Sequence, residues 1–281
     1  MTATAPTTGF PLPLLLNPSK IFNVRVTFLG TADGYTSPIR DHSGILIQTR
    51  ESTILLDSGA DIARYLLHKK FEPDTPDLIW LSHMHSDHVG KFMSLIQSLW
   101  LRRRRAPLHV CGPGRVLEAM EAWLEQSILF PRLIGFPIHW HPVKPGRKFR
   151  KNPFSYTAFA TKHLANLASI FKPKYPQTCY DCYGVAITYR NERYVYSADL
   201  HHPRELRPAL KQPTKALFCE LTHFTEEDLF KELAQHSVKS VWITHYPDHL
   251  IGEESEIRAV ARREKFKGCV NLMSDKRTVE I

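Results

Sequence analysis

The stretch LSHMHSDHVG, residues 81–90, holds four side chains that can bind a metal: His83, His85, Asp87 and His88. Imidazole suits zinc and its first-row neighbours, and a carboxylate can serve as a ligand or as a base. Four such groups in one loop exceed what a mononuclear site normally takes from a single segment. The apolar run before His83 predicts a buried strand, so His83 and His85 project to one side if the extended backbone continues. The stretch therefore predicts a metal-binding loop at a strand end.

Three more candidate ligands, His163, Asp199 and His245, each stand at the end of a predicted strand. A single histidine at such a position is more often structural than functional. In layered α/β folds, however, ligands gather beyond the carboxyl ends of strands, where the loops converge. Together with the first loop, these residues make a seven-residue set that could hold two metals.

The rest of the chain alternates between strand and helix patterns in two halves. In the first half, the patterns predict strands at 22–30, 44–50, 52–59, 76–83 and 107–113, and helices at 62–70, 90–105 and 114–127. In the second half they predict strands at 153–163, 183–190, 192–199, 214–221 and 238–245, and helices at 225–236, with Thr225 as N-cap, and at 253–266. The C-terminal tail could add a last strand.

Length and composition fit a globular protein. The 281 residues suit one large domain or two fused halves, and 43% hydrophobic with 23% charged residues allows a substantial core. The formal net charge of +9 favours anionic partners, although a solvated basic surface explains it equally well. We expect an arm at residues 1–20 followed by a single domain at 21–281.

The N-terminal segment lacks a basic start, and Pro11 and Pro13 interrupt its apolar run, so it does not resemble a signal peptide. No stretch is long and apolar enough to span a bilayer, so we expect no membrane partner. Five cysteines are too few, and odd in number, for a disulfide scaffold. This usage favours a reducing compartment, and we expect the cytoplasm.

These motifs resemble the metallo-β-lactamase superfamily. Its five signatures occur in order: Asp57 in LLDSG, the HMHSDH stretch, His163, Asp199 in YSAD and His245 in ITH. The resemblance covers about residues 24–245 and implies a four-layer αββα sandwich of two similar halves.

The resemblance also implies roles for the candidate residues. One metal would be bound by His83, His85 and His163, and a second by Asp87, His88 and His245, with Asp199 bridging the two. Asp57 would support the metal loop from behind, although a simple turn carboxylate before Gly59 is the alternative.

Such a site suits hydrolysis. Two divalent metals about 3.5–4 Å apart hold an oxygen between them, and hydroxide becomes available near neutral pH. That bound hydroxide would attack a phosphorus or carbonyl centre, with Asp87 orienting it or moving a proton. We expect two divalent ions, zinc first, with manganese and iron as open alternatives.

The opening VTFLGTADGYTSPIRDHSGILIQ resembles ribonuclease Z and its phosphodiesterase relatives, including Arg40 and Ser43 before the second strand. CELTH matches the His-Glu-Ala-Thr stretch of ribonuclease Z at Glu220 and Thr222, but Cys219 stands in place of the His. His223 could substitute for it or could only cap a helix. We carry Asp87, His223 and Glu220 forward as catalytic candidates.

A second departure follows the last ligand, where Pro247 and Asp248 stand instead of the Ser and Arg of ribonuclease Z. No long Gly- and Pro-rich insertion resembles its tRNA-binding arm. Both departures favour a smaller substrate than tRNA. The Arg102–Arg105 run could contact phosphate or be a solvated helix end. Cys179 and Cys182 form a single CxxC, which suits structural thiols, half a metal site or a redox pair.

The sequence thus predicts a dinuclear metal-dependent hydrolase of a small phosphodiester or a nucleotide- or RNA-related substrate. A lactone, thioester or carboxylic ester hydrolase on the same site is one alternative. A metal-stabilised binding protein for nucleic acid or for another protein is an alternative from a different class. The expected partners are a small anionic substrate, such as a nucleotide or RNA, and a second copy in a homodimer, as in many ribonuclease Z-like proteins.

Overall fold

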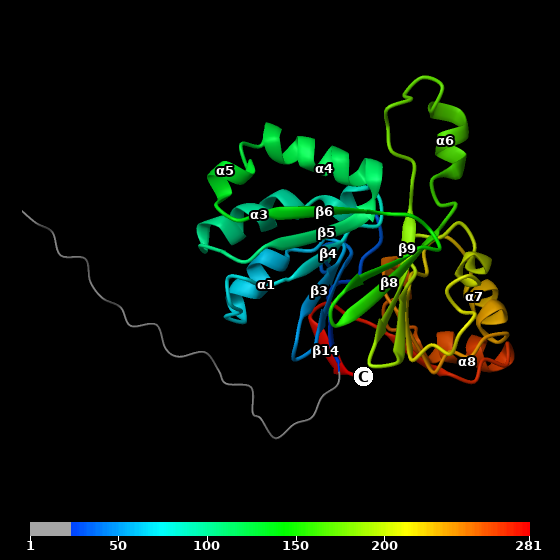
Figure 1. Cartoon of the computed structure of the whole chain (residues 1–281). Helices are drawn as coiled ribbons and strands as arrows, with labels where there is room; N and C mark the ends of the chain where they lie inside the picture. Colours follow the sequence, from blue (N-terminus) through cyan, green and yellow to red (C-terminus); the bar gives the residue numbers. More distant parts are fainter. Residues whose placement is uncertain (1–23) are drawn as a thin grey trace, which may run out of the picture.

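Two seven-stranded β-sheets form the centre of the molecule (Figure 1). The computed structural model describes residues 24–281, so the predicted arm at residues 1–20 lies outside the described part. The first sheet has the order β14 (Arg277–Glu280), β1 (Arg25–Gly30), β2 (Gly44–Gln48), β3 (Thr53–Leu56), β4 (Leu78–Trp80), β5 (Leu108–Pro113) and β6 (Ile138–Val143). The second has the order β13 (Cys269–Leu272), β12 (Ser240–Ile243), β11 (Ala216–Cys219), β10 (Glu192–Tyr196), β9 (Tyr183–Tyr189), β8 (Phe154–Ala160) and β7 (Lys148–Lys151).

Helices cover the outer face of each sheet. The first sheet packs against α1 (Ile62–His68), α3 (Phe92–Leu101), α4 (Gly114–Gln126) and α5 (Pro131–Ile134). The second packs against α7 (Glu226–Leu233), α8 (Glu254–Arg263) and the short 3₁₀ helix η1 (Pro203–Leu206). One more helix, α6 (Ala165–Phe171), rises above the sheets and buries none of its residues (Figure 1). None of the helices in residues 24–281 combines the length and apolarity that crossing a bilayer requires.

Three separate apolar clusters correspond to the three interfaces between four layers. In β2, Ile45 and Ile47 face the cluster between the two sheets, whereas Leu46 faces the cluster under the helices. Successive side chains of a strand point to opposite faces, so a strand covered on both sides must be apolar throughout. This explains the continuous apolar runs in the sequence, and the predicted αββα arrangement is confirmed.

Parallel pairing places the functional loops at one edge. β3, β4, β5 and β6 run parallel in the first sheet, as do β10, β11, β12 and β13 in the second. The predicted strands ran too far, however, to His83, His163, Asp199 and His245. The observed strands end two or three residues earlier, at Trp80, Ala160, Tyr196 and Ile243. The candidate ligands therefore belong to loops, which are free to turn toward one another.

The predicted helix at 90–105 is also shorter than expected. It ends at Leu101, and Arg103 has a positive φ of 61°. The side chain of Arg104 is buried, where it donates to the carbonyl oxygens of Ala106 and Pro107 at 2.9 Å each. The Arg102–Arg105 run is therefore not a uniformly solvated helix end; one of its guanidinium groups closes the turn that leads into β5.

The C-terminal tail contributes two strands, where the sequence suggested one. β13 extends the second sheet, and β14 returns to the first sheet to pair antiparallel with β1. The patterns did not predict β6, β7 or α6, which lie at the edges of the sandwich or outside it. Edge elements bury less apolar surface, so their sequences carry a weaker periodic signal.

Candidate metal centre

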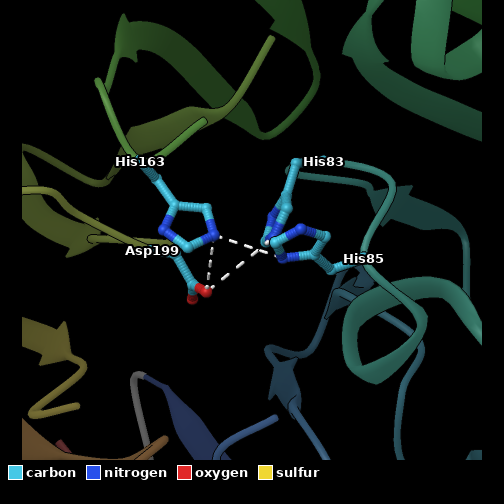
Figure 2. A group of neighbouring side chains, drawn as sticks. All are labelled: His83, His85, His163 and Asp199. Atoms are coloured by element: carbon cyan, nitrogen blue, oxygen red, sulfur yellow. Dashed lines mark hydrogen bonds and ion pairs between the residues drawn. The ribbon is translucent and has the colours of Figure 1, made fainter. Parts of the chain in front are cut away.

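Loops from both sheets bring the seven predicted ligands into two adjoining groups. One group is His83, His85, His163 and Asp199, and the other is Asp87, His88, Asp199 and His245. Within each group, the potential ligand atoms all lie within 4.8 Å of one another. Figure 2 shows the first group, in which His83 and His163 face the Asp199 carboxylate and His85 faces His163. The short helix α2 (Ser86–Val89) turns Asp87 and His88 toward the second group.

The Asp199 carboxylate lies between the two groups. Its Oδ2 is 3.5 Å from His163 Nε2 and 3.8 Å from His83 Nε2. Its Oδ1 is 3.1 Å from His88 Nε2 and 3.4 Å from His245 Nε2. Each oxygen thus faces a different set of histidines, which is the arrangement of a carboxylate that bridges two cations.

Several polar atoms at this centre are buried but have no hydrogen-bond partner within residues 24–281. They include Nε2 of His83, Nε2 of His88 and Oδ1 of Asp199. A buried polar group left without a partner costs about 1–3 kcal/mol. Because lone pairs from imidazole and carboxylate are what divalent transition metals accept, the residues fit a pair of metal ions.

Asp57 fixes the orientation of two of these histidines. Its Oδ2 accepts hydrogen bonds from His88 Nδ1 at 2.7 Å, Ser82 Oγ at 2.6 Å and Tyr196 OH at 2.7 Å. Because the Ser82 hydroxyl hydrogen goes to Asp57, His83 Nδ1, 3.0 Å away, donates to Ser82 Oγ. Nδ1 of both rings is then the donor, which makes Nε2 the nitrogen available for metal binding.

Backbone strain accompanies the site. Asp57, Ala198 and His245 all have positive φ angles, of 56°, 51° and 50°. Such conformations cost a non-glycine residue on the order of 1–3 kcal/mol and persist where the surroundings enforce them. His245 is itself a predicted ligand, Ala198 precedes the predicted ligand Asp199, and Asp57 supports the metal loop. The strained backbone therefore directs side chains of the site.

Gly59 allows the metal loop to pack closely. A Cβ atom at this position would lie 1.7 Å from the carbonyl oxygen of Asp87. Backbone hydrogen bonds from Ser43 to Asp87 and from Ser58 to His88 join the same segments, at 3.1 and 2.7 Å. The glycine in LLDSG is therefore required by the approach of the Asp87–His88 turn.

The pKa values of the histidines differ between the two groups. Burial holds the pKa of His83 well below its ordinary value and lowers the pKa of His163 to about 4, so both rings are neutral near pH 7. Burial opposes ionisation of Asp199, but His245 and His88 outweigh it and hold the pKa of this carboxyl well below its usual range. Burial opposes the charged forms of His88 and His245, but Asp199 outweighs burial and raises the pKa of both rings, so these two would release a proton when a metal binds.

A family model described as anti-Pycsar protein Apyc1 matches residues 24–266. The chain belongs to the Apyc1 family. All seven predicted ligands and Asp57 lie within the matched part.

Ribonuclease Z proteins are also similar in sequence. The protein from Picosynechococcus is 32% identical over 142 residues, which is 50% of this chain and 44% of the relative. The protein from Methanothermobacter thermautotrophicus is 28% identical over 152 residues, 54% of this chain and 48% of the relative. The matched region thus spans about half the length of these curated relatives.

Solved structures show the fold. The metallo-β-lactamase-fold protein YhfI from Bacillus subtilis has a TM-score of 0.72 and 20% identity, covering 92% of this chain and 100% of that one. The short form of human tRNase Z has a TM-score of 0.68 and 16% identity, covering 92% and 99%. Unliganded yeast PDE1 has a TM-score of 0.69 and 11% identity, covering 93% and 100%. This member of the Apyc1 family therefore has the predicted metallo-β-lactamase fold.

The other two catalytic candidates form a pair beside the metal groups. His223 Nδ1 lies 2.7 Å from Glu220 Oε2, and the His223 ring centroid is 4.6 Å from that of His163. Glu220 is buried and also accepts from the backbone of Leu200, Thr222 and His223. Glu220 thus lies behind His223 and orients it. Cys219, by contrast, packs in the apolar cluster outside the second sheet, so a larger side chain there would point away from the metals.

The cysteines of the CxxC are both buried and unpaired. Cys182 Sγ lies 3.5 Å from the backbone carbonyl of Asp199, to which it donates. Sequence reasoning passed over Ser82 and Tyr196, whose hydroxyls complete the Asp57 network. Their positions in the sequence could have indicated a role at the site, because Ser82 precedes His83 and Tyr196 lies three residues before Asp199.

Proposed function

We propose that this protein is a metal-dependent phosphodiesterase with a dinuclear centre. The observation that carries the proposal is the Asp199 carboxylate, whose two oxygens face two separate sets of histidines. His83, His85 and His163 would hold one ion and Asp87, His88 and His245 the other, with zinc preferred for its affinity for imidazole. Manganese and iron are compatible with the same donors.

Two such ions, when bound, supply a nucleophilic water at neutral pH and neutralise charge on a phosphoryl group. The remaining steps fall to side chains. Asp87 is ionised, since His88 and His245 outweigh the effect of burial and lower its pKa, and it can accept a proton or orient the attacking water. His223, oriented by Glu220, can hold a proton at Nε2 for the leaving group.

The substrate in this proposal is a small phosphodiester or a nucleotide- or RNA-related molecule. Net charge of +9 supports an anionic substrate. The similarity to ribonuclease Z and to structures named tRNase Z and PDE1 supports cleavage of a phosphodiester. We also propose a cytoplasmic homodimer; all five cysteines are free thiols, which supports the reducing compartment.

A substrate panel on protein of defined metal content tests the activity. We expect cleavage of bis(p-nitrophenyl) phosphate that depends on the metal, and its loss in His83→Ala with an unchanged circular dichroism spectrum. His139→Ala is the matched control, because His139 is an exposed histidine of β6 outside both metal groups. Turnover of lactones or thioesters without turnover of any phosphodiester would contradict the proposal, as would wild-type protein that retains fewer than about one metal per chain.

A further inference from the structure

Arg40 joins the loop after β1 to the loop after β12, next to the predicted ligand His245. Its Nη1 donates to the carbonyl oxygen of Thr31 at 3.0 Å, and its Nη2 donates to that of Tyr246 at 2.7 Å. Its Nε donates to Asp248 Oδ1 at 3.0 Å, and its guanidinium lies 4.2 Å from the centre of the Tyr246 ring. We call Arg40, Tyr246 and Asp248 the Arg40 clamp.

The guanidinium of Arg40 is buried, and protein groups take up its hydrogen-bond donors. The Arg40 side chain is only 5% exposed, and all three of its nitrogens have protein acceptors. Burying a guanidinium is costly unless it is paired and hydrogen-bonded. Asp248 supplies the counter-charge and also accepts a hydrogen bond from Ser37 Oγ at 2.9 Å. The arginine is therefore committed to holding two loops together.

His245 lacks the support that the other buried ligands have. His88 Nδ1 is held by Asp57, and His83 Nδ1 by Ser82, but Nδ1 of His245 is buried without a hydrogen-bond partner within residues 24–281. Metal-binding histidines usually donate this second ring nitrogen to an acceptor that fixes the ring. Because no partner in the described part of the chain holds Nδ1 of this ring, contacts to the backbone of the segment must position His245.

The backbone on both sides of the His245 ring performs this task. The carbonyl oxygen of His245 accepts from Leu221 N at 3.1 Å and from Thr222 Oγ1 at 2.7 Å. The next residue, Tyr246, is held through its N–H by Thr31 at 3.2 Å and through its carbonyl by Arg40. Because His245 has a φ of 50°, it would relax toward a more favourable conformation if the following residue were released.

We propose that the Arg40 clamp positions His245 for the second metal by holding its strained backbone from outside the site. The inference rests on the proposed role of His245 as a ligand. Arg40 is thus a positioning residue: it acts through the backbone beside His245 on the binding of the second ion and does not itself bind the substrate phosphate.

Cobalt titration of the stripped full-length protein, followed by visible absorption, separates the two ions. In Arg40→Lys and Arg40→Gln we expect the second equivalent to bind at least ~10-fold more weakly and the first to change less than about twofold. Asp248→Asn keeps the two carbonyl contacts of Arg40 and should cause a smaller loss. Arg190→Lys is the matched control: Arg190 pairs with Glu51 at 2.6 Å and also joins the two sheets, but it is exposed, in the turn between β9 and β10.

Unchanged affinity for both equivalents in the folded Arg40 variants would overturn the inference, as would an equal loss of both. If the Arg40 variants do not fold, Asp248→Asn decides: weaker binding of the second equivalent alone supports the clamp, and unchanged binding of it overturns it. Wild-type protein that binds fewer than two equivalents would instead overturn the proposed dinuclear function, so the two failures are distinguishable.

Discussion

Asp57 belongs to neither metal group, yet three donors converge on one of its oxygens. Through His88 directly, and through Ser82 to His83, it sets the tautomer of one histidine in each group. A single carboxylate thus orients a histidine in each of the two proposed metal positions. The sequence suggested support from behind, but the route through Ser82 depends on the fold and was not predictable from spacing.

We expect Asp57→Asn to weaken metal binding by about 10–100-fold, because an amide has one acceptor oxygen and cannot serve both the three donors at Oδ2 and the Ser82 N–H at Oδ1, which releases the histidine tautomers. Metal analysis after dialysis against a chelator measures the change. Asp61→Asn, which alters the N-cap of α1 outside the site, is the control. Equal metal affinity in Asp57→Asn and wild type would contradict this role.

His223 gives a second prediction at this scale. Burial opposes its charged form, but the hydrogen bond to Glu220 outweighs burial and raises the pKa of His223 above its ordinary value. If it donates a proton to the leaving group, activity falls as pH rises through this raised pKa. We expect His223→Ala to lose that alkaline fall and to lower kcat by about 10²-fold or more with poor leaving groups.

Metal content of His223→Ala should remain at the wild-type level, as measured by elemental analysis alongside the pH profile. p-Nitrophenol esters should be affected least, since that leaving group needs little protonation. A uniform loss for all leaving groups, with the pH profile unchanged, would indicate that His223 is structural.

At the scale of elements, function depends on where the strands stop. Sequence patterns located the strands before all four ligand loops, since those strands are apolar and buried. The patterns carried each strand to the ligand itself, because Ser82, Thr161 and Thr244 are compatible with an extended backbone. Tertiary contacts, such as those that impose a positive φ on Ala198 and His245, end the strands earlier. Local sequence does not encode those contacts.

One contact between elements has a pH dependence of its own. Glu232 of α7 is buried, and its carboxylate accepts from Arg207 Nε at 2.7 Å, Arg207 Nη2 at 2.9 Å and His236 Nε2 at 2.9 Å. Burial opposes its ionisation, but these bonds outweigh burial and lower the pKa of Glu232 below 4.5. The stability that it contributes is therefore present above pH 4.5 and is lost as pH falls through the lowered value.

We expect Glu232→Gln to reduce the free energy of unfolding by about 1–3 kcal/mol at pH 7, with a smaller difference in acid. Urea denaturation at several pH values measures it. The control, Glu227→Gln, removes an exposed pair with Arg263 and should change stability by less than about 1 kcal/mol. A difference for Glu232→Gln that is the same at pH 7 and in acid would contradict the assignment.

Across the whole molecule, the candidate metal centre draws its residues from both sheets. His83, His85, Asp87 and His88 follow β4 of the first sheet, whereas His163, Asp199 and His245 follow strands of the second. The duplication of strand and helix patterns predicted these two halves. It did not predict that β14 would cross from the second half to the first, because a short exposed strand pairs with whichever edge the fold presents.

Because ions that bind only the folded protein stabilise it by mass action, removing the metal should lower the melting temperature. We expect Tm to fall on chelation and to rise with added zinc. At a zinc concentration of a hundredfold excess over Kd, the free energy of unfolding should increase by about 3 kcal/mol. Calorimetry with and without chelator measures this. Asp199→Ala should lose most of the shift, since its carboxylate faces both groups; a zinc-independent Tm in wild type would contradict a metal that joins the sheets.

The pairing of β14 with β1 has a consequence for biosynthesis. Arg25 and Glu280 lie opposite each other in the two strands and are 255 positions apart in the chain. At translation rates of about 5–20 residues per second, the outer edge of β1 waits roughly 13–50 s for its partner to leave the ribosome. An unpaired edge of this kind invites intermolecular strand pairing. Nascent chains of this protein should therefore depend on chaperones until the last strand emerges.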